Sequence, residues 1–381
     1  MAVPPKEPPI IPPIKKAGCP TAPALNFTHK MKYQQHKDTT DPISVDGLLA
    51  DFQQQQQAFN QPPEYVGLFT IRTGNQWIKE AKNRPVPQML FDVFWFEGEI
   101  CILFAGSNQG KSILAVQIAD AISRGAAVPG FRLEAARQWV LYFDFELSDK
   151  QFETRYSADY TSHYVFDDYF LRVEMNSDAD APANSTAFDE LIIQSIEQAV
   201  LQYGVKVLII DNLTFLRSTE PENAKEASPL MKQLKALKKK HGLSLLILAH
   251  TPKRDQSRPL TQNDLQGSSR LMQFADSAFA IGASARDNGL KYLKQVKVRN
   301  TGFVFDSDNV ALCQIHKPDN FLQLGHIGYA YEQEHLRVNS EKDTEGRKER
   351  AQELKAKGMN NSQIAREISV SEGAVRKYFK A

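Results

Sequence analysis

Continuous apolar runs recur through the middle of the chain and predict buried β-strands at residues 100–104, 138–145, 205–210 and 243–249. Between these runs, apolar residues spaced three and four apart predict amphipathic helices at 113–119, 190–203 and 229–240. Strands that alternate with helices are typical of α/β proteins, in which helices flank a mostly parallel sheet. We therefore expect an α/β domain over about residues 65–331, with an aromatic run at 91–96 that is either core or the lining of a base pocket, core being favoured.

The two ends of the chain have different patterns. Residues 1–64 contain paired prolines and a glutamine run, with too few apolar residues for a core, so we expect a disordered arm. A short helix over 45–58 and a role in docking a partner are the alternatives there. A polar linker is expected over 332–346, and helical spacing returns over 347–381, which predicts a small all-α domain.

Composition excludes several broad classes. The 381 residues are 42% hydrophobic and 24% charged, and the net charge of +1 gives no overall attraction to nucleic acid, so any basic footprint is local. Cys19, Cys101 and Cys313 are too far apart for a disulfide framework or a metal site, and Cys101 is expected in the core. No apolar stretch is long enough for a membrane span and no signal peptide is recognisable, so we expect a cytoplasmic protein without membrane contact.

The strongest motif follows the first predicted strand. Residues 105–112 read Ala-Gly-Ser-Asn-Gln-Gly-Lys-Ser and precede a predicted helix, the context of a phosphate-binding loop. The backbone N–H groups of such a loop and the start of the helix attract phosphate groups, which we expect here to be those of ATP. Lys111 would neutralise the β- and γ-phosphates, and the Ser112 hydroxyl would bind Mg²⁺. Ala105 replaces the usual first glycine. The predicted cofactor-binding residues are Ala105, Gly106, Ser107, Asn108, Gln109, Gly110, Lys111, Ser112 and Ile113.

Polar residues stand at the carboxyl ends of the later strands, where open parallel sheets bind their ligands. Asp211 is a candidate second Mg²⁺ residue, and Glu146 is a candidate general base for an attacking water. Asp144 lies on the same face of its strand and is the competing choice for the base. His250 either senses the γ-phosphate or is an ordinary strand-end histidine.

These segments resemble the RecA-like P-loop ATPases, in the branch of hexameric replicative helicases and plasmid RepA-like helicases. The resemblance runs from about residue 95 to 305 and rests on Gly-Ser-Asn-Gln-Gly-Lys-Ser, Phe-Glu-Leu-Ser at 145–148, Leu-Ile-Ile-Asp-Asn-Leu at 208–213 and Leu-Ala-His-Thr-Pro-Lys at 248–253. It implies a RecA-like fold, ATP and Mg²⁺ as cofactors, Glu146 as the catalytic base and His250 as the γ-phosphate sensor.

The same resemblance implies that a neighbouring subunit completes the site. Lys297 and Arg299 match the Lys-x-Arg pair that reaches into the adjacent ATP site, which implies a homo-oligomer, a hexameric ring. The alternative is that both residues lie on the solvated face of an edge strand. Gly267–Arg270 resembles the segment that faces the central channel, and Lys253 and Arg254 in the loop before it are candidates for contact with single-stranded DNA.

The C-terminal residues resemble the helix-turn-helix of resolvases and small regulators. Ser362 and Ser371 are predicted to cap the second and third helices, and Ile364, Ile368, Val370 and Val375 to form the core. The resemblance places Glu372, Gly373, Arg376 and Lys377 near duplex DNA. The alternative is a helical hairpin that serves only for packing.

The sequence thus predicts an ATP-hydrolysing DNA motor, a ring helicase or translocase in plasmid or mobile-element replication by resemblance. The alternative is a DNA-bound regulatory or recombination ATPase that uses ATP as an assembly switch without unwinding. A third possibility is a nucleotide-binding scaffold without turnover.

Overall fold

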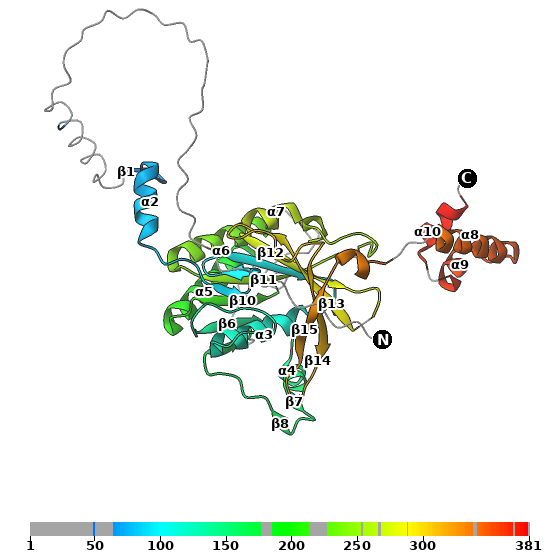
Figure 1. Cartoon of the computed structure of the whole chain (residues 1–381), viewed down its shortest axis with the longest axis horizontal. Coiled ribbons are helices and arrows are strands. Elements are labelled where there is room, and N and C mark those ends of the chain that lie inside the picture. Colours follow the sequence, from blue (N-terminus) through cyan, green and yellow to red (C-terminus); the bar gives the residue numbers. More distant parts are fainter. Residues whose placement is uncertain are drawn as a thin grey trace, which may run out of the picture. The chain divides into compact units, whose positions relative to one another are not determined.

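The computed structural model describes residue 49 and residues 64–176, 185–212, 227–252, 254–265, 268–287, 289–337, 341–368 and 370–379 (Figure 1). The chain divides into two compact units, Met1–Arg84 and Pro85–Ala381. Apart from residues 49 and 64, the predicted N-terminal arm lies outside the described residues, as does most of the possible helix at 45–58. In the described part of the chain, no helix combines the length and apolar character needed to cross a bilayer.

The described part of the first unit is a small hairpin followed by a helix. Strands β1 (Glu64–Val66) and β2 (Phe69–Ile71) pair antiparallel, and α2 spans Gly74–Lys82. Thr73 and Gln76 form a capping box, in which each side chain bonds the other's backbone N–H and fixes where α2 begins. Residues 65–84 fall in the first unit, Met1–Arg84, whereas the sequence predicts them as the start of the large α/β domain.

The second unit contains a nine-stranded sheet in the order β15-β14-β13-β12-β5-β11-β10-β6-β9. The six strands from β12 to β9 are mutually parallel, and β13, β14 and β15 continue the sheet antiparallel. The strands are β5 (Ile100–Ala105), β6 (Val140–Asp144), β9 (Phe170–Val173), β10 (Val207–Asp211), β11 (Ser244–His250), β12 (Ser277–Ala283), β13 (Leu290–Lys297), β14 (Val310–His316) and β15 (Gln323–Ala330). This confirms the α/β class and the mostly parallel sheet.

Alternate residues of the parallel strands enter two separate cores, because successive side chains of a strand point to opposite faces. In β5, Cys101 and Leu103 pack on the face covered by α3 (Lys111–Arg124). Ile102 and Phe104 pack on the face covered by α5 (Ser185–Tyr203), α6 (Ala227–His241) and α7 (Ser268–Phe274). Figure 1 shows α3 on the opposite side of the sheet from α5, α6 and α7. Because both faces are covered, the strands read as continuous apolar runs.

The aromatic run belongs to the core, as predicted. It forms β3 (Met89–Phe91) and β4 (Trp95–Phe96), and Phe91, Phe94 and Trp95 are at most 1% exposed. The ring of Phe94 stacks on Phe305, with centroids 4.8 Å apart. Cys101 is also fully buried, as expected.

The remaining short elements are α4 (Asp149–Arg155), β7 (Ser157–Ala158) paired with β8 (Ser162–His163), and the 3₁₀ helix η1 (Gln262–Asp264). Residues 251–267, which contain η1, read as a long polar loop in the sequence. In the structure Leu260 and Leu265 anchor this loop, since they are 3% and 2% exposed.

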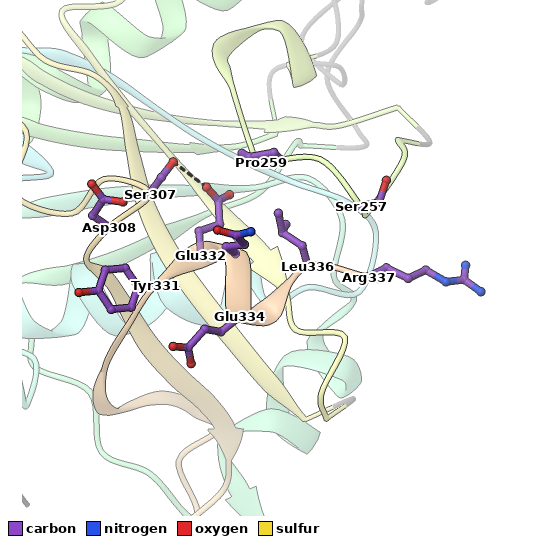
Figure 2. Close-up of a pocket in the computed structure, with 10 residues that line it drawn as sticks. Ser257, Pro259, Ser307, Asp308, Tyr331, Glu332, Glu334, Leu336 and Arg337 are labelled. Carbon is purple, nitrogen blue, oxygen red and sulfur yellow. Dashed lines mark hydrogen bonds between the residues drawn. The ribbon is translucent and has the colours of Figure 1, made fainter. Parts of the chain in front are cut away.

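The predicted linker begins too early. Residues Glu332–His335 form the 3₁₀ helix η2, and Glu332 is completely buried. Its carboxylate accepts hydrogen bonds from Ser307 Oγ at 2.9 Å and Lys294 Nζ at 2.5 Å. Figure 2 shows Ser307 and Glu332 turned toward each other, and Arg337 extended away from them. A buried carboxylate needs such partners, and they tie this segment to the sheet.

Residues near the C-terminus form three helices, α8 (Glu341–Ala356), α9 (Asn361–Glu367) and α10 (Glu372–Tyr378). Ile364 and Val375 are fully buried in their shared core, and Ile368 and Val370 pack against it. Ser371 caps α10 as predicted. The prediction for α9 is wrong, because Asn360 rather than Ser362 is its N-cap and forms a capping box with Gln363.

Candidate functional site

Four parallel strands bring the predicted polar residues to one edge of the sheet. The strand β11 lies between β5 and β10, and β6 lies beyond β10. In this register His250 pairs with Ala105, and Asp211 pairs with Asp144. Because Ile210 pairs with Ile247, β5 and β11 extend about two residues beyond the ends of β6 and β10. The loop after β5, the turn after β6 and the ends of β10 and β11 therefore converge, as expected for a site at a carboxyl edge.

The phosphate loop joins β5 to α3 through a tight turn. Asn108 and Gly110 have positive φ angles of 59° and 93°, the left-handed region that favours glycine. A Cβ atom on Gly110 would also lie 3.0 Å from Ile315 Cδ1. Because Gly110 precedes α3 and has no side chain, the described structure shows no side-chain cap on this helix. Its first N–H groups can therefore face an anion.

The alanine at position 105 fits this loop without distortion. Ala105 is still part of β5, is 1% exposed and packs in the core on the α3 side of the sheet. Its carbonyl oxygen accepts hydrogen bonds from Thr251 N at 3.0 Å and Lys111 Nζ at 3.2 Å. The positive φ angles of the loop come later, so the first loop position does not require a glycine.

Lys111 is the first residue of α3, and its ammonium group lies inside the loop. Nζ also lies 3.3 Å from the Gly106 oxygen and 3.4 Å from Nδ1 of His250. Burial lowers the pKa of Lys111, and the nearby Asp211 and Glu146 carboxylates oppose this shift. The ammonium thus hydrogen-bonds backbone carbonyl oxygens, and a rotation of the side chain can direct it to phosphate oxygens instead.

Ser112 and Asp211 form the part of the site that fits Mg²⁺. Asp211 is 1% exposed, and its Oδ2 accepts a hydrogen bond of 2.7 Å from the Tyr142 hydroxyl. Its Oδ1 is buried without a hydrogen-bond partner among the described residues. Burial raises the pKa of Asp211 to about 6, and the neighbouring hydroxyls of Ser112 and Tyr142 act in the opposite direction. A buried carboxylate oxygen beside a serine hydroxyl suits a hydrated Mg²⁺ that also binds phosphate.

Glu146 lies in the turn after β6 and faces the other strand ends. Its Oε1 accepts a hydrogen bond from the amide of Asn212 and lies 3.5 Å from Nε2 of His250. The Asn212 amide nitrogen is also 3.1 Å from that same Nε2. The pKa of Glu146 is lowered overall. The hydrogen bond with His250 contributes most to this shift, burial opposes it, and Lys111 and Asn212 lower the pKa further. The carboxylate is therefore ionised at neutral pH.

The competing candidate, Asp144, is fully engaged elsewhere. It is 2% exposed and accepts hydrogen bonds from the backbone N–H groups of Glu146 and Leu147 at 3.2 and 3.1 Å. Its other oxygen accepts from Arg172 Nε at 2.9 Å. Asp144 thus holds the turn that carries Glu146, and its oxygens face this turn and Arg172.

A cavity of about 440 Å³ borders the phosphate loop. Gly106, Ser107 and Gln109 line one side of it, and Thr251 and Tyr292 lie on others. The larger cavity, of about 690 Å³, is lined by residues beside η2 (Figure 2) and by none of the predicted site residues. The three loop residues in its lining therefore make the smaller cavity the one that adjoins the site, although Lys111, Glu146 and His250 are not among the residues that line it.

Lys297 and Arg299 lie where the parallel strands β5 and β12 begin, opposite to the strand ends that carry the site. Lys297 ends β13 and pairs with Ala278 near the start of β12. Arg299 binds Asp276 at 2.9 Å, and Asn300 binds Glu99, which immediately precedes β5. The interpretation of an edge strand is wrong, because β13 pairs with β12 and β14. Only Arg299 of the pair is largely exposed, at 54% of its side chain.

The predicted DNA-contacting residues fall into three groups. Lys253 lies outside the described residues. Arg254 is directed inward, with a side chain 17% exposed and an ion pair of 3.2 Å to Asp264, because the loop is packed rather than free. Arg376 and Lys377 are exposed on α10, and Arg376 binds Glu372 at 2.7 Å.

Sequence reasoning missed three residues that shape the site. Asn212 connects Glu146 to His250, Tyr142 orients Asp211, and Arg172 binds Asp144. The only sequence signal for a role of Asn212 is its position directly after Asp211. Nothing in the sequence pattern of β9 indicates that Arg172 reaches the end of β6.

The comparisons with known proteins agree with this arrangement. A family model described as an AAA domain matches residues 70–256, a range that contains the phosphate loop, Glu146, Asp211 and His250. No curated protein matches the chain. Residues 70–256 are thus similar to an AAA domain.

Proposed function

We propose that this chain is an ATP-hydrolysing, DNA-binding motor, a RepA-like ring helicase or translocase in plasmid or mobile-element replication. One observation carries the hydrolytic part of the proposal. The loop ammonium of Lys111, the buried Asp211, the ionised Glu146 and the His250 ring meet at one edge of the sheet. ATP binding alone needs the first two, whereas a carboxylate and a histidine in contact support hydrolysis.

Each residue has a physical role in this proposal. Loop N–H groups and Lys111 would hold the β- and γ-phosphates, while Ser112 and Asp211 would hold Mg²⁺, which would supply positive charge to neutralise the phosphates. Glu146 accepts a proton from the water that attacks the γ-phosphorus as the bond to the leaving oxygen breaks. His250 contacts both Lys111 and Glu146, so it is placed to respond when phosphate is lost.

The position of Arg299 supports assembly. Arg299 binds Asp276, and the next residue, Asn300, binds Glu99; both partners lie beside the start of β5. The phosphate loop, in contrast, follows the end of β5. The six residues of β5, at about 3.3 Å each, separate the two edges by roughly 20 Å. Arg299 cannot reach the phosphates of its own subunit, so a catalytic role requires a neighbouring copy.

We expect Arg299→Ala to lower kcat for ATP at least about tenfold while sparing nucleotide affinity, because the lost cation would act on the transferring phosphoryl group in trans. Mixing Arg299→Ala with Glu146→Gln subunits should restore part of the activity, since some interfaces then combine an intact base with an intact arginine. Phosphate release from mixtures of the two variants measures this.

The control for that experiment is Arg286→Ala, an exposed arginine paired with Glu334 near η2. It should leave kcat unchanged, which would show that removing an exposed, paired arginine does not by itself lower turnover. Mixtures of Arg299→Ala and Glu146→Gln that never exceed the activity of either variant would contradict the role in trans.

The three C-terminal helices support a duplex-binding role. Their compact core leaves Arg376 and Lys377 exposed on α10, the helix that would enter the major groove. We expect the double substitution of Arg376 and Lys377 by alanine to weaken duplex binding about tenfold or more, because each lost phosphate or base contact removes affinity. Fluorescence anisotropy with a labelled duplex at fixed salt measures the change.

A matched control removes the same charge from another helix of this unit. Lys348 and Arg350 are exposed on α8, and replacing both by alanine should change duplex affinity much less. Equal losses of duplex affinity in the two double variants would mean that α10 contributes only its net charge. This result would contradict its role as the recognition helix.

The second candidate function is a DNA-bound regulatory or recombination ATPase without unwinding. The same C-terminal helices favour it, because a duplex-binding unit can hold the ATPase at one place on DNA. Strand displacement on a forked duplex separates the two candidates. A motor of the proposed kind displaces a strand when ATP is present, whereas wild-type protein that hydrolyses ATP on DNA and never unwinds it would establish the second candidate.

A further inference from the structure

We propose that Arg172 and Asp144 act as a clamp that positions Glu146, so that both are positioning residues for ATP hydrolysis. The proposal rests on the function proposed above and adds residues that neither the loop motif nor the strand-end motifs include. Among the described residues, neither side chain hydrogen-bonds a residue of the phosphate loop. Their effect on the reaction would pass through the backbone of the turn at residues 145–148.

Asp144 holds this turn from the end of β6. One oxygen, Oδ1, accepts hydrogen bonds from the N–H groups of Glu146 and Leu147, which are consecutive in the turn. The Asp144 side chain is fully buried, so water does not compete for these bonds. The direction in which Glu146 leaves the backbone is thereby fixed relative to β6.

Arg172 closes the clamp from β9, the strand next to β6. Its Nε donates to Asp144 Oδ2 at 2.9 Å, and its Nη2 donates to the carbonyl oxygen of Leu147 at 2.7 Å. One planar guanidinium thus holds the carboxylate and the turn at once, a fork that lysine cannot reproduce. Its Nη1 donates to Asp149 Oδ1 at 2.9 Å, and the group lies 4.7 Å above the ring of Phe152. Both partners belong to α4, which starts immediately after the turn.

The turn is also fastened to the strand that carries the Mg²⁺ residue. The N–H of Phe145 donates to the backbone oxygen of Asp211 at 3.0 Å. Glu146 is therefore flanked by two fixed residues, with Phe145 bound to β10 and Leu147 bound through both of its backbone groups. A general base must lie within hydrogen-bond reach of its water, and a displacement of about 1 Å can cost about a hundredfold in rate.

The same two strands provide a control pair. Arg137 and Asp167 precede β6 and β9 and form an ion pair with Nη2 distances of 2.8 and 2.9 Å. Arg137 also lies over an aromatic ring, that of Tyr169, at 4.0 Å. This pair thus matches the clamp in chemistry and joins the same strands, but it lies at the edge of the sheet opposite to Glu146. A general contribution to stability should appear at both pairs, and an effect on the base only at the clamp.

The experiment compares Arg172→Gln, Arg172→Lys and Arg137→Gln in the full chain. We expect Arg172→Gln to lower kcat for ATP by tenfold to a hundredfold and to change the affinity for a non-hydrolysable ATP analogue less than about threefold. Arg172→Lys keeps the charge but not the fork, so its kcat should fall between those of wild type and Arg172→Gln. Arg137→Gln should keep the wild-type kcat.

A fourth variant tests whether the clamp acts through Glu146. When Glu146 is already glutamine, Arg172→Gln should cause no further loss of the residual rate. A further loss by the same factor as in wild type, or a wild-type kcat in Arg172→Gln, would overturn the clamp. Parallel losses of kcat and analogue affinity in both Arg172→Gln and Arg137→Gln would also overturn it. If Glu146→Gln itself keeps the wild-type kcat, the proposed hydrolytic mechanism fails instead, which distinguishes the two failures.

Discussion

Glu146→Gln is expected to lower the rate of ATP hydrolysis by about a hundredfold to ten-thousandfold, the contribution of a positioned general base. The substitution keeps the shape of the side chain and its hydrogen bond with Asn212 through the glutamine oxygen. It removes the charge that accepts the proton of water. Nucleotide binding should persist because Lys111, Ser112 and Asp211 are untouched. Phosphate release and binding of a fluorescent ATP analogue, measured in parallel, test both parts.

The matched control is Glu153→Gln on α4, because Glu153 is a nearby glutamate whose carboxylate pairs with Lys150 and His163 instead of the strand-end residues. Its substitution should leave hydrolysis unchanged. Unaltered hydrolysis in Glu146→Gln would remove Glu146 from the mechanism, and Asp144 could not simply replace it, since Asp144 is bound by Arg172 and by the turn.

Lys111→Ala is expected to weaken ATP binding by about a hundredfold or more, because removing one partner of a buried charged contact costs several kcal/mol. The substitution should not unfold the domain. The Lys111 ammonium is buried and its pKa is lowered by that burial, so its removal relieves a desolvation cost. Loss of binding with an unchanged unfolding midpoint would therefore reflect the lost phosphate contact.

Binding of the fluorescent analogue by titration, together with a thermal unfolding curve, measures this prediction. Lys150→Ala, which removes an exposed lysine from α4, should bind nucleotide like wild type. Tight ATP binding by Lys111→Ala would contradict the proposed role of the loop.

The sequence predicts the core of this structure well because the relevant signals are local. A run of apolar residues such as 205–210 must be buried on both faces, and Asp211 at its end must then lie at the sheet edge. The phosphate loop and the strands that carry Asp144 and His250 follow from the same reasoning. The convergence of Lys111, Glu146 and His250 needed only the assumption that these strands are parallel neighbours.

Features that depend on distant pairing could not be predicted in this way. Arg172 meets Asp144 because β9 pairs with β6, a contact that no local pattern specifies. Glu332 reads as the polar start of a linker, and only its hydrogen bonds with the buried Lys294 and with Ser307 explain why it is inside. The cap of α9 was assigned to Ser362 although Asn360 is an equally good capping residue, so sequence alone could not distinguish them.

The central claim is that this chain hydrolyses ATP at the edge of the sheet where β5, β6, β10 and β11 end. The most direct test is a time course of phosphate release by the wild-type chain with ATP and single-stranded DNA, with Mg²⁺ or with excess EDTA. The account predicts multiple turnovers with Mg²⁺ and none with EDTA, because Ser112 and Asp211 hold the ion that neutralises the phosphates. Binding of ATP without release of phosphate, under conditions where the protein is folded, would contradict it.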